Sequence, residues 1–142
     1  MIKNERQYKI TRSRAYEVRN ALGELQRTPL SDGLQPEMRE LQLDALSGML
    51  GDLQAELAEY DALHDATVIK ATGIEQLPTS LIQARIACGL TQRQLAERIG
   101  VREQAIQRYE ATGYFGASFA RLVEIANALG ISVEYVIHRD RS

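Results

Sequence analysis

The sequence predicts an all-α protein made of a long N-terminal helical hairpin and a following cluster of five short helices. Apolar residues recur at steps of three and four through residues 15–60, the pattern of amphipathic helices. After residue 78, glycines and capping residues divide the chain into short helical stretches. We therefore expect a hairpin over residues 1–66, a connector over 67–77 and a helical domain over 78–142.

Composition and charge restrict the class of protein. The 142 residues, 44% hydrophobic and 25% charged, suit one average domain or two small ones. Residues 1–27 hold seven basic and three acidic side chains (+4), and residues 28–65 hold one and nine (−8). Residues 66–142 hold nine and seven (+2), which gives the total of −2. Any affinity for nucleic acid must therefore come from the local distribution of charge.

The single cysteine, Cys88, excludes an internal disulfide and a cysteine-cluster zinc site, and we expect it to be a small core residue. No apolar run approaches the ~20 residues of a membrane span. The first ten residues are too charged for a signal peptide. We therefore expect a cytoplasmic protein that does not contact a membrane.

The first helix of the hairpin is expected to begin at Thr11, a suitable N-cap, and to end in the turn-rich stretch 28–36. Its apolar residues, at steps of three, four and three, are Ala15, Val18, Leu22 and Leu25.

The second helix is expected to begin at Pro36, which suits a first helical turn. It carries a heptad seam formed by Leu43, Leu46, Leu50, Leu53, Leu57 and Tyr60. The seam can pack within one chain, with the basic first helix on the acidic second helix. Because two helices make a thin core, we expect the seam to contribute to a homodimer interface.

Five short helices are expected after residue 78. Pro78 opens the first and Gly89 ends it, and Thr91 with Gln94 predicts a capping box for a helix over 92–99. Further helices are expected over 102–111 and 118–129. Ser132 is expected to cap a last short helix whose inward-facing side chains are Val133, Val136 and Ile137.

The second and third of these helices have the features of a helix-turn-helix pair. Ala96 is small where the helices cross, and Gly100 occupies a sharp turn that demands a positive φ. Ile106 is the apolar residue that packs the following helix back onto the domain.

Residues 78–137 resemble the Xre/Cro family of lambda-repressor-like DNA-binding domains, on the segments GLTQRQLAERIGV, IQRYE and IANALGISVEYVI. The resemblance implies a five-helix domain that binds double-stranded DNA in the major groove. The residues it places at the DNA are Gln92, Arg93, Arg102, Glu103, Gln104, Gln107 and Arg108. Gln92 is also implied to brace the recognition helix.

The resemblance further implies a buried pair, Arg85 with Glu110, that joins the first and third helices of the domain. After Glu110 the sequence departs from the family pattern, because Ala111-Thr112-Gly113 replaces the usual Asn-Gly and the next loop is longer.

Three functions remain open at this point. The first is a sequence-specific transcriptional regulator, a repressor that acts as a homodimer on a palindromic operator. The second is an antitoxin that binds both DNA and a toxin protein. The third is a helical interaction module that no longer reads DNA. The sequence offers no acid–base pair, phosphate loop or metal-ligand cluster, so we expect neither an enzyme nor a cofactor or metal.

Overall fold

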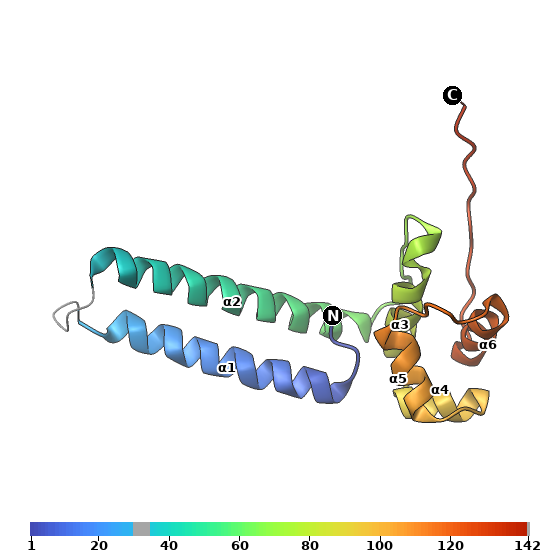
Figure 1. Cartoon of the computed structure of the whole chain (residues 1–142), viewed down its shortest axis with the longest axis horizontal. Coiled ribbons are helices and arrows are strands. Elements are labelled where there is room, and N and C mark those ends of the chain that lie inside the picture. Colours follow the sequence, from blue (N-terminus) through green and yellow to red (C-terminus); the bar gives the residue numbers. More distant parts are fainter. Residues whose placement is uncertain (30–34, 142) are drawn as a thin grey trace. The chain divides into compact units, whose positions relative to one another are not determined.

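A computed structural model describes residues 1–29 and 35–141 of the chain. Over these residues the structure is helical and contains no strand, which confirms the predicted all-α class. The chain divides into two compact units, residues 1–65 and 66–142. In order (Figure 1), the elements are α1 (Glu5–Arg27), α2 (Pro36–Leu63), the 3₁₀ turn η2 (Ile74–Gln76), α3 (Leu77–Ala87), α4 (Gln92–Ile99), α5 (Glu103–Ala111) and α6 (Phe119–Leu129).

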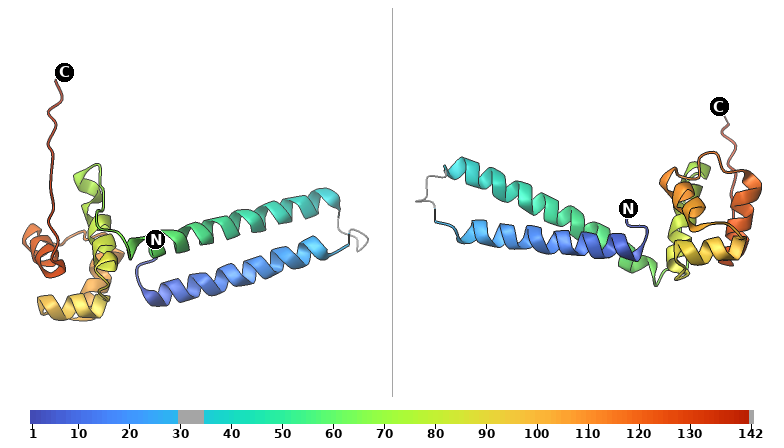
Figure 2. Two further views of the ribbon diagram at one scale, coloured as in Figure 1. Left: turned by 180° about the vertical axis from the view of Figure 1, so that it is seen from behind. Right: turned by 60° about the horizontal axis from the view of Figure 1, so that its bottom comes forward.

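The first unit is an antiparallel hairpin of α1 and α2, which lie side by side in all three ribbon views (Figures 1 and 2). On α1 the positions shielded from solvent step by three and four, as do those of the α2 seam. They are Tyr8, Thr11, Ala15, Val18, Leu22 and Leu25, and Gly23 beside Leu22 is also half-buried. Tyr8 pairs with Tyr60, with ring centroids 5.0 Å apart, which fixes the register of the two helices. The α2 seam therefore packs against α1 of its own chain, where its leucines are half-buried.

Polar contacts hold both ends of the hairpin. At one end the Tyr8 hydroxyl donates to Asp61 Oδ2 at 3.1 Å, and this hydrogen bond raises the pKa of Tyr8. At the other end Arg39 Nη2 donates to the carbonyl oxygens of Leu25 and Gln26, at 3.0 and 2.9 Å. Because both carbonyls belong to the last turn of α1, no backbone N–H of that helix donates to them.

The start of α1 differs from the prediction. The helix begins at Glu5, and its N-cap is Asn4, whose Oδ1 accepts from the Gln7 backbone N at 2.8 Å. Thr11 lies inside the helix and belongs to the seam. Asn caps as well as Thr, and capping there lets Tyr8 join the packed face. Most of the predicted turn, residues 30–34, lies outside the described residues.

The second unit packs α3 to α6 around a small core. Its most deeply buried apolar side chains, each at 2% exposure or less, are Leu81, Ile86, Leu95, Ala96, Ile106 and Ile125. Ser118 caps α6 through a hydrogen bond from the Arg121 backbone N, and Gly130 ends it with a φ of 67°.

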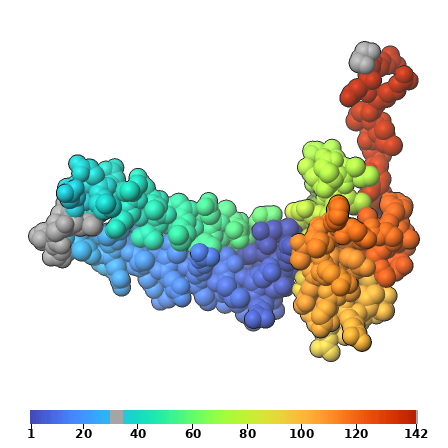
Figure 3. Space-filling model, in the orientation of Figure 1, coloured from blue at the N-terminus to red at the C-terminus, as the bar shows by residue number. Residues whose placement is uncertain are grey.

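The last predicted helix is not formed. Residues 131–141 form no helix after Gly130, and the C-terminal part of this segment stands clear of the unit in the space-filling view (Figure 3). Val136 and Ile137, expected to face inward, are 78% and 93% exposed. A single turn rich in β-branched residues has low helix propensity and no stability of its own, so it needs packing that this tail lacks.

Cys88 is also exposed, contrary to the prediction that it is a core residue. It follows the last residue of α3, and its thiol donates to the Leu129 carbonyl oxygen at 3.5 Å. The apolar pattern of α3 located the helix end correctly but not the direction of this side chain.

Candidate nucleic-acid interface

The turn between α4 and α5 sets the angle at which α5 leaves α4. Thr91 and Gln94 form a reciprocal capping box, with hydrogen bonds of 3.0 and 2.9 Å, and this confirms the predicted start of α4. Gly100 has a φ of 72°, the left-handed conformation predicted for it. Ala96 is 1% exposed, so a larger side chain there would push the neighbouring helices apart.

A buried polar network joins α3, α4 and α5. Arg85 Nε donates to Glu110 Oε1 at 2.5 Å, and Arg85 Nη2 donates to Glu110 Oε2 at 3.1 Å. Gln92 Nε2 donates to the same Oε2 at 2.7 Å. Arg85 and Glu110 are 2% and 1% exposed, and Arg85 Nη1 also reaches the Leu90 carbonyl. Such a paired and hydrogen-bonded arrangement is what makes buried charges tolerable.

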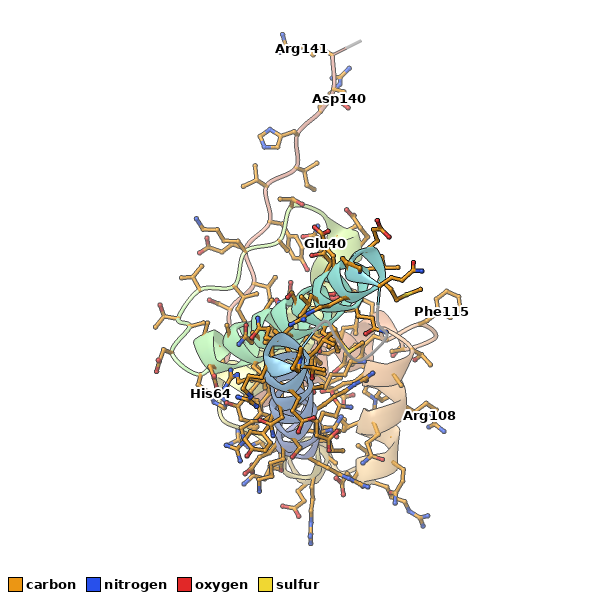
Figure 4. The ribbon with its side chains drawn as sticks, turned by 90° about the vertical axis from the view of Figure 1, so that its left-hand side faces the viewer. Glu40, His64, Arg108, Phe115, Asp140 and Arg141 are labelled. Atoms are coloured by element: carbon orange, nitrogen blue, oxygen red, sulfur yellow. The ribbon has the colours of Figure 1, made fainter. Side chains whose placement is uncertain are left out.

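The network and Ile106, which is 0% exposed, fix the inner face of α5. The opposite face is exposed and carries side chains at positions i, i+3, i+4 and i+7, namely Gln104, Gln107, Arg108 and Ala111. Arg108 projects away from the domain in Figure 4. Arginine suits the guanine edge and glutamine the adenine edge in the major groove. The structure therefore presents a helix that is anchored on its inner face and carries, on its free face, side chains of types that can pair with base edges.

The other residues named from the resemblance lie around this face. Arg102 is the exposed N-cap residue of α5. Glu103 is half-buried, and its Oε1 accepts from Gln107 Nε2 at 3.5 Å. On α4, Arg93 is exposed and pairs with Glu97 at 3.3 Å. Both members of that pair are solvated, so Arg93 can exchange Glu97 for another anion at little cost.

Gln92 is buried at the start of α4. Its side chain is 7% exposed and is held against Glu110, where it braces α5. Its contact with DNA stays a prediction, and a side chain that swung out to a phosphate would break this buried hydrogen bond to Glu110.

Two supporting features were missed in the sequence. Arg98 Nη1 donates to the Ala128 carbonyl at 2.8 Å, which ties α4 to the last turn of α6. Tyr114 stacks on Tyr109, with ring centroids 5.7 Å apart and an interplanar angle of 9°. A basic residue near a helix end is only a weak sequence signal for the Arg98 contact. The stack was not predictable, because Tyr109 and Tyr114 do not share a periodic pattern in the sequence.

Four short helices, a glycine turn and an exposed face on the second helix of the pair define a helix-turn-helix DNA-binding domain. The comparison with known families agrees, since residues 81–136 match the helix-turn-helix family model HTH_3, of the Xre/lambda-repressor-like type. That family is a DNA-binding regulatory domain and not an enzyme family. Residues 81–136 accordingly form a DNA-binding domain of the Xre type, which supports a role for the protein in transcriptional regulation.

No curated protein and no solved structure was found to match the chain. Within residues 1–29 and 35–141, no helix combines the length and the apolar character that crossing a bilayer requires.

Proposed function

We propose that the protein is a sequence-specific repressor that binds a palindromic operator as a homodimer. The observation that carries the proposal is the exposed face of α5, where Gln104, Gln107 and Arg108 lie opposite a completely buried anchor. A base-reading helix must be held in a fixed position, because hydrogen bonds to base edges tolerate little displacement. Arg102 at the start of α5 and Arg93 on α4 are the proposed phosphate contacts.

Repression follows from occupancy. A twofold-symmetric dimer of this kind places its recognition helices ~34 Å apart, in successive major grooves on one side of the duplex. A promoter that contains such a site is covered while the dimer is bound. The modest excess of basic charge in residues 66–142 predicts weak non-specific binding, so discrimination must come from base contacts.

The hairpin also supports the proposed homodimer through exposed apolar residues beside the predicted seam. With the seam packed against α1, the N-terminal half of α2 still exposes three large apolar side chains. Met38, Leu41 and Met49 are 51%, 65% and 42% exposed. An isolated two-helix hairpin buries little apolar area, and a second hairpin placed on these residues would bury more.

DNA binding is tested by selection from a random duplex library with the full chain. We expect enrichment of a palindrome with two half-sites about one helical turn apart. Binding of the selected and scrambled duplexes is then compared by fluorescence anisotropy. Equal affinity for the two duplexes would contradict the proposal.

Dimerisation is tested by sedimentation equilibrium of Leu41→Glu in the full chain. We expect a shift from dimer to monomer, because the change introduces a charge into the apolar contact. Val68→Glu is the matched control, since Val68 is 70% exposed and lies outside the hairpin. An unchanged dimer for Leu41→Glu would move the interface elsewhere, and a monomeric wild type would reject the homodimer.

A further inference from the structure

The turn between α5 and α6 places two adjacent aromatic residues in opposite environments. Tyr114 is 4% exposed and adopts a φ of 59°, which is unusual for a residue other than glycine. Phe115 is 90% exposed. The residue with a polar tip is therefore buried, and the purely apolar ring lies in solvent.

This arrangement is unfavourable on both sides. The Tyr114 hydroxyl is buried without a hydrogen-bond partner in the part of the chain that the structure describes. An unsatisfied buried hydroxyl costs free energy, and so does a phenyl ring left in water. Exchanging the two residues would remove both penalties from the isolated domain. The present order is explained if the exposed ring of Phe115 has a partner outside the chain.

The turn holds Phe115 in a defined place relative to α5. The Tyr114 ring stacks on Tyr109 of α5, and the Tyr114 backbone N donates to the Tyr109 carbonyl at 2.7 Å. The Phe115 backbone N donates to the Thr112 carbonyl at 3.1 Å, and the Ala117 backbone N donates to the Tyr114 carbonyl at 3.0 Å. A side chain presented on such a closed turn loses little backbone freedom on binding.

Position and charge identify the partner. Figure 4 shows Arg108 and Phe115 projecting toward the same side of the domain. Between Glu110 and Glu124 the chain has no acidic residue and one basic residue, Arg121. Glu110 itself is buried against Arg85, so it presents no exposed charge. A polyanion can therefore approach this turn without repulsion from it.

We propose that Phe115 is a DNA contact, with its ring packed on the apolar surface of a nucleotide beside the bases read by α5. Deoxyribose carbons and the thymine methyl group are the apolar surfaces that a duplex offers there. This inference rests on the proposed function, and it adds a contact outside the recognition helix.

The test is the affinity of full-length Phe115→Ala for the selected duplex, measured by anisotropy over a range of salt concentrations. We expect a loss of roughly 10-fold, the effect of exposing part of one aromatic ring. The slope of affinity against salt should stay unchanged, because no charge is removed. Phe119→Ala is the matched control, since Phe119 is 72% exposed and lies on α6. Its affinity should remain within about twofold of wild type.

Several outcomes would overturn the inference. If wild type prefers the selected duplex and Phe115→Ala binds it equally well, Phe115 is not a DNA contact and the proposed function stands. If Phe115→Ala loses affinity for DNA and sedimentation shows that the variant has become a monomer, the ring packs on a second copy of the chain instead. If wild type shows no preference between selected and scrambled DNA, the proposed function itself fails, and this inference fails with it.

Discussion

The two units of this protein are stabilised in different ways. In the hairpin, α1 and α2 touch along seams whose leucines are half-buried, and the ion pair of Lys9 with Glu5 is exposed. In the second unit, four helices surround side chains of 0–2% exposure, and the ion pair of Arg85 with Glu110 is buried. A spacer or docking arm tolerates loose packing. The base-reading role proposed for α5 requires a fixed support, and the buried network provides one.

The largest expected effect is the loss of that network. Glu110→Ala leaves the Arg85 guanidinium buried without its carboxylate and should destabilise the second unit by about 3 kcal/mol. Hydrogen exchange of the α3 and α5 amides in the full chain reports this unit separately from the hairpin. The matched control is Glu5→Ala, which removes an exposed pair in the hairpin and should have no measurable effect. Similar protection in wild type and Glu110→Ala would contradict the difference between the units.

Arg108→Ala tests whether the second unit contacts bases through α5. We expect the binding free energy for the selected duplex to weaken by ~1–3 kcal/mol, and the preference at one base pair to relax. Arg93→Ala removes a proposed phosphate contact and should weaken binding to selected and scrambled DNA alike. Competition with the two duplexes measures both effects. If Arg108→Ala lost affinity equally on the two duplexes, Arg108 would contact phosphate rather than bases.

Tyr114→Phe removes a buried hydroxyl that has no hydrogen-bond partner among the described residues, and it should stabilise the second unit by about 1 kcal/mol. Burial, together with the negative charge of Glu110, raises the pKa of Tyr114. Above the ordinary tyrosine value of about 10, the unfolded chain therefore releases this proton while the folded chain retains it. The stability of wild type should fall as pH rises beyond that value, and Tyr114→Phe should reduce this fall. Denaturation at neutral and alkaline pH checks both points, and a destabilised Tyr114→Phe at neutral pH would mean that the hydroxyl is hydrogen-bonded.

The smallest expected effects are in the hairpin. Gly48 and Gly51 lie inside α2, and a Cβ at either position meets no atom within 4 Å. Gly48→Ala and Gly51→Ala should each stabilise the helix by ~0.5–1 kcal/mol, because alanine has the higher helix propensity. Thermal melting followed by circular dichroism measures the change. A loss of stability that depends on protein concentration would instead indicate that a second copy packs closely on these glycines.

The sequence predicted those parts of the structure that depend on local chemistry. The Thr91 capping box, the left-handed Gly100 and the bounds of α4 all follow from residue types at fixed spacing. The start of α1 at Asn4 was missed because Asn4 and Thr11 are both good caps, and the choice depends on tertiary packing.

Features that depend on a partner surface were not predictable. Val136 and Ile137 have the pattern of a buried helix, but periodicity cannot show whether a surface exists to cover them. Likewise, nothing in the adjacent pair Tyr114 and Phe115 shows which ring turns inward. The position of Gln92 followed from the resemblance, whereas its burial against Glu110 required the structure.

The central claim is that the exposed face of α5 reads bases in the major groove. Its most direct test replaces each guanine of the selected duplex in turn with 7-deazaguanine, which lacks the N7 acceptor, and measures affinity for wild type and Arg108→Ala. We expect one position in each half-site where the replacement weakens binding of wild type but not of Arg108→Ala, with a coupling of ~1–3 kcal/mol. Penalties that are equal for the two proteins at every guanine would contradict the claim.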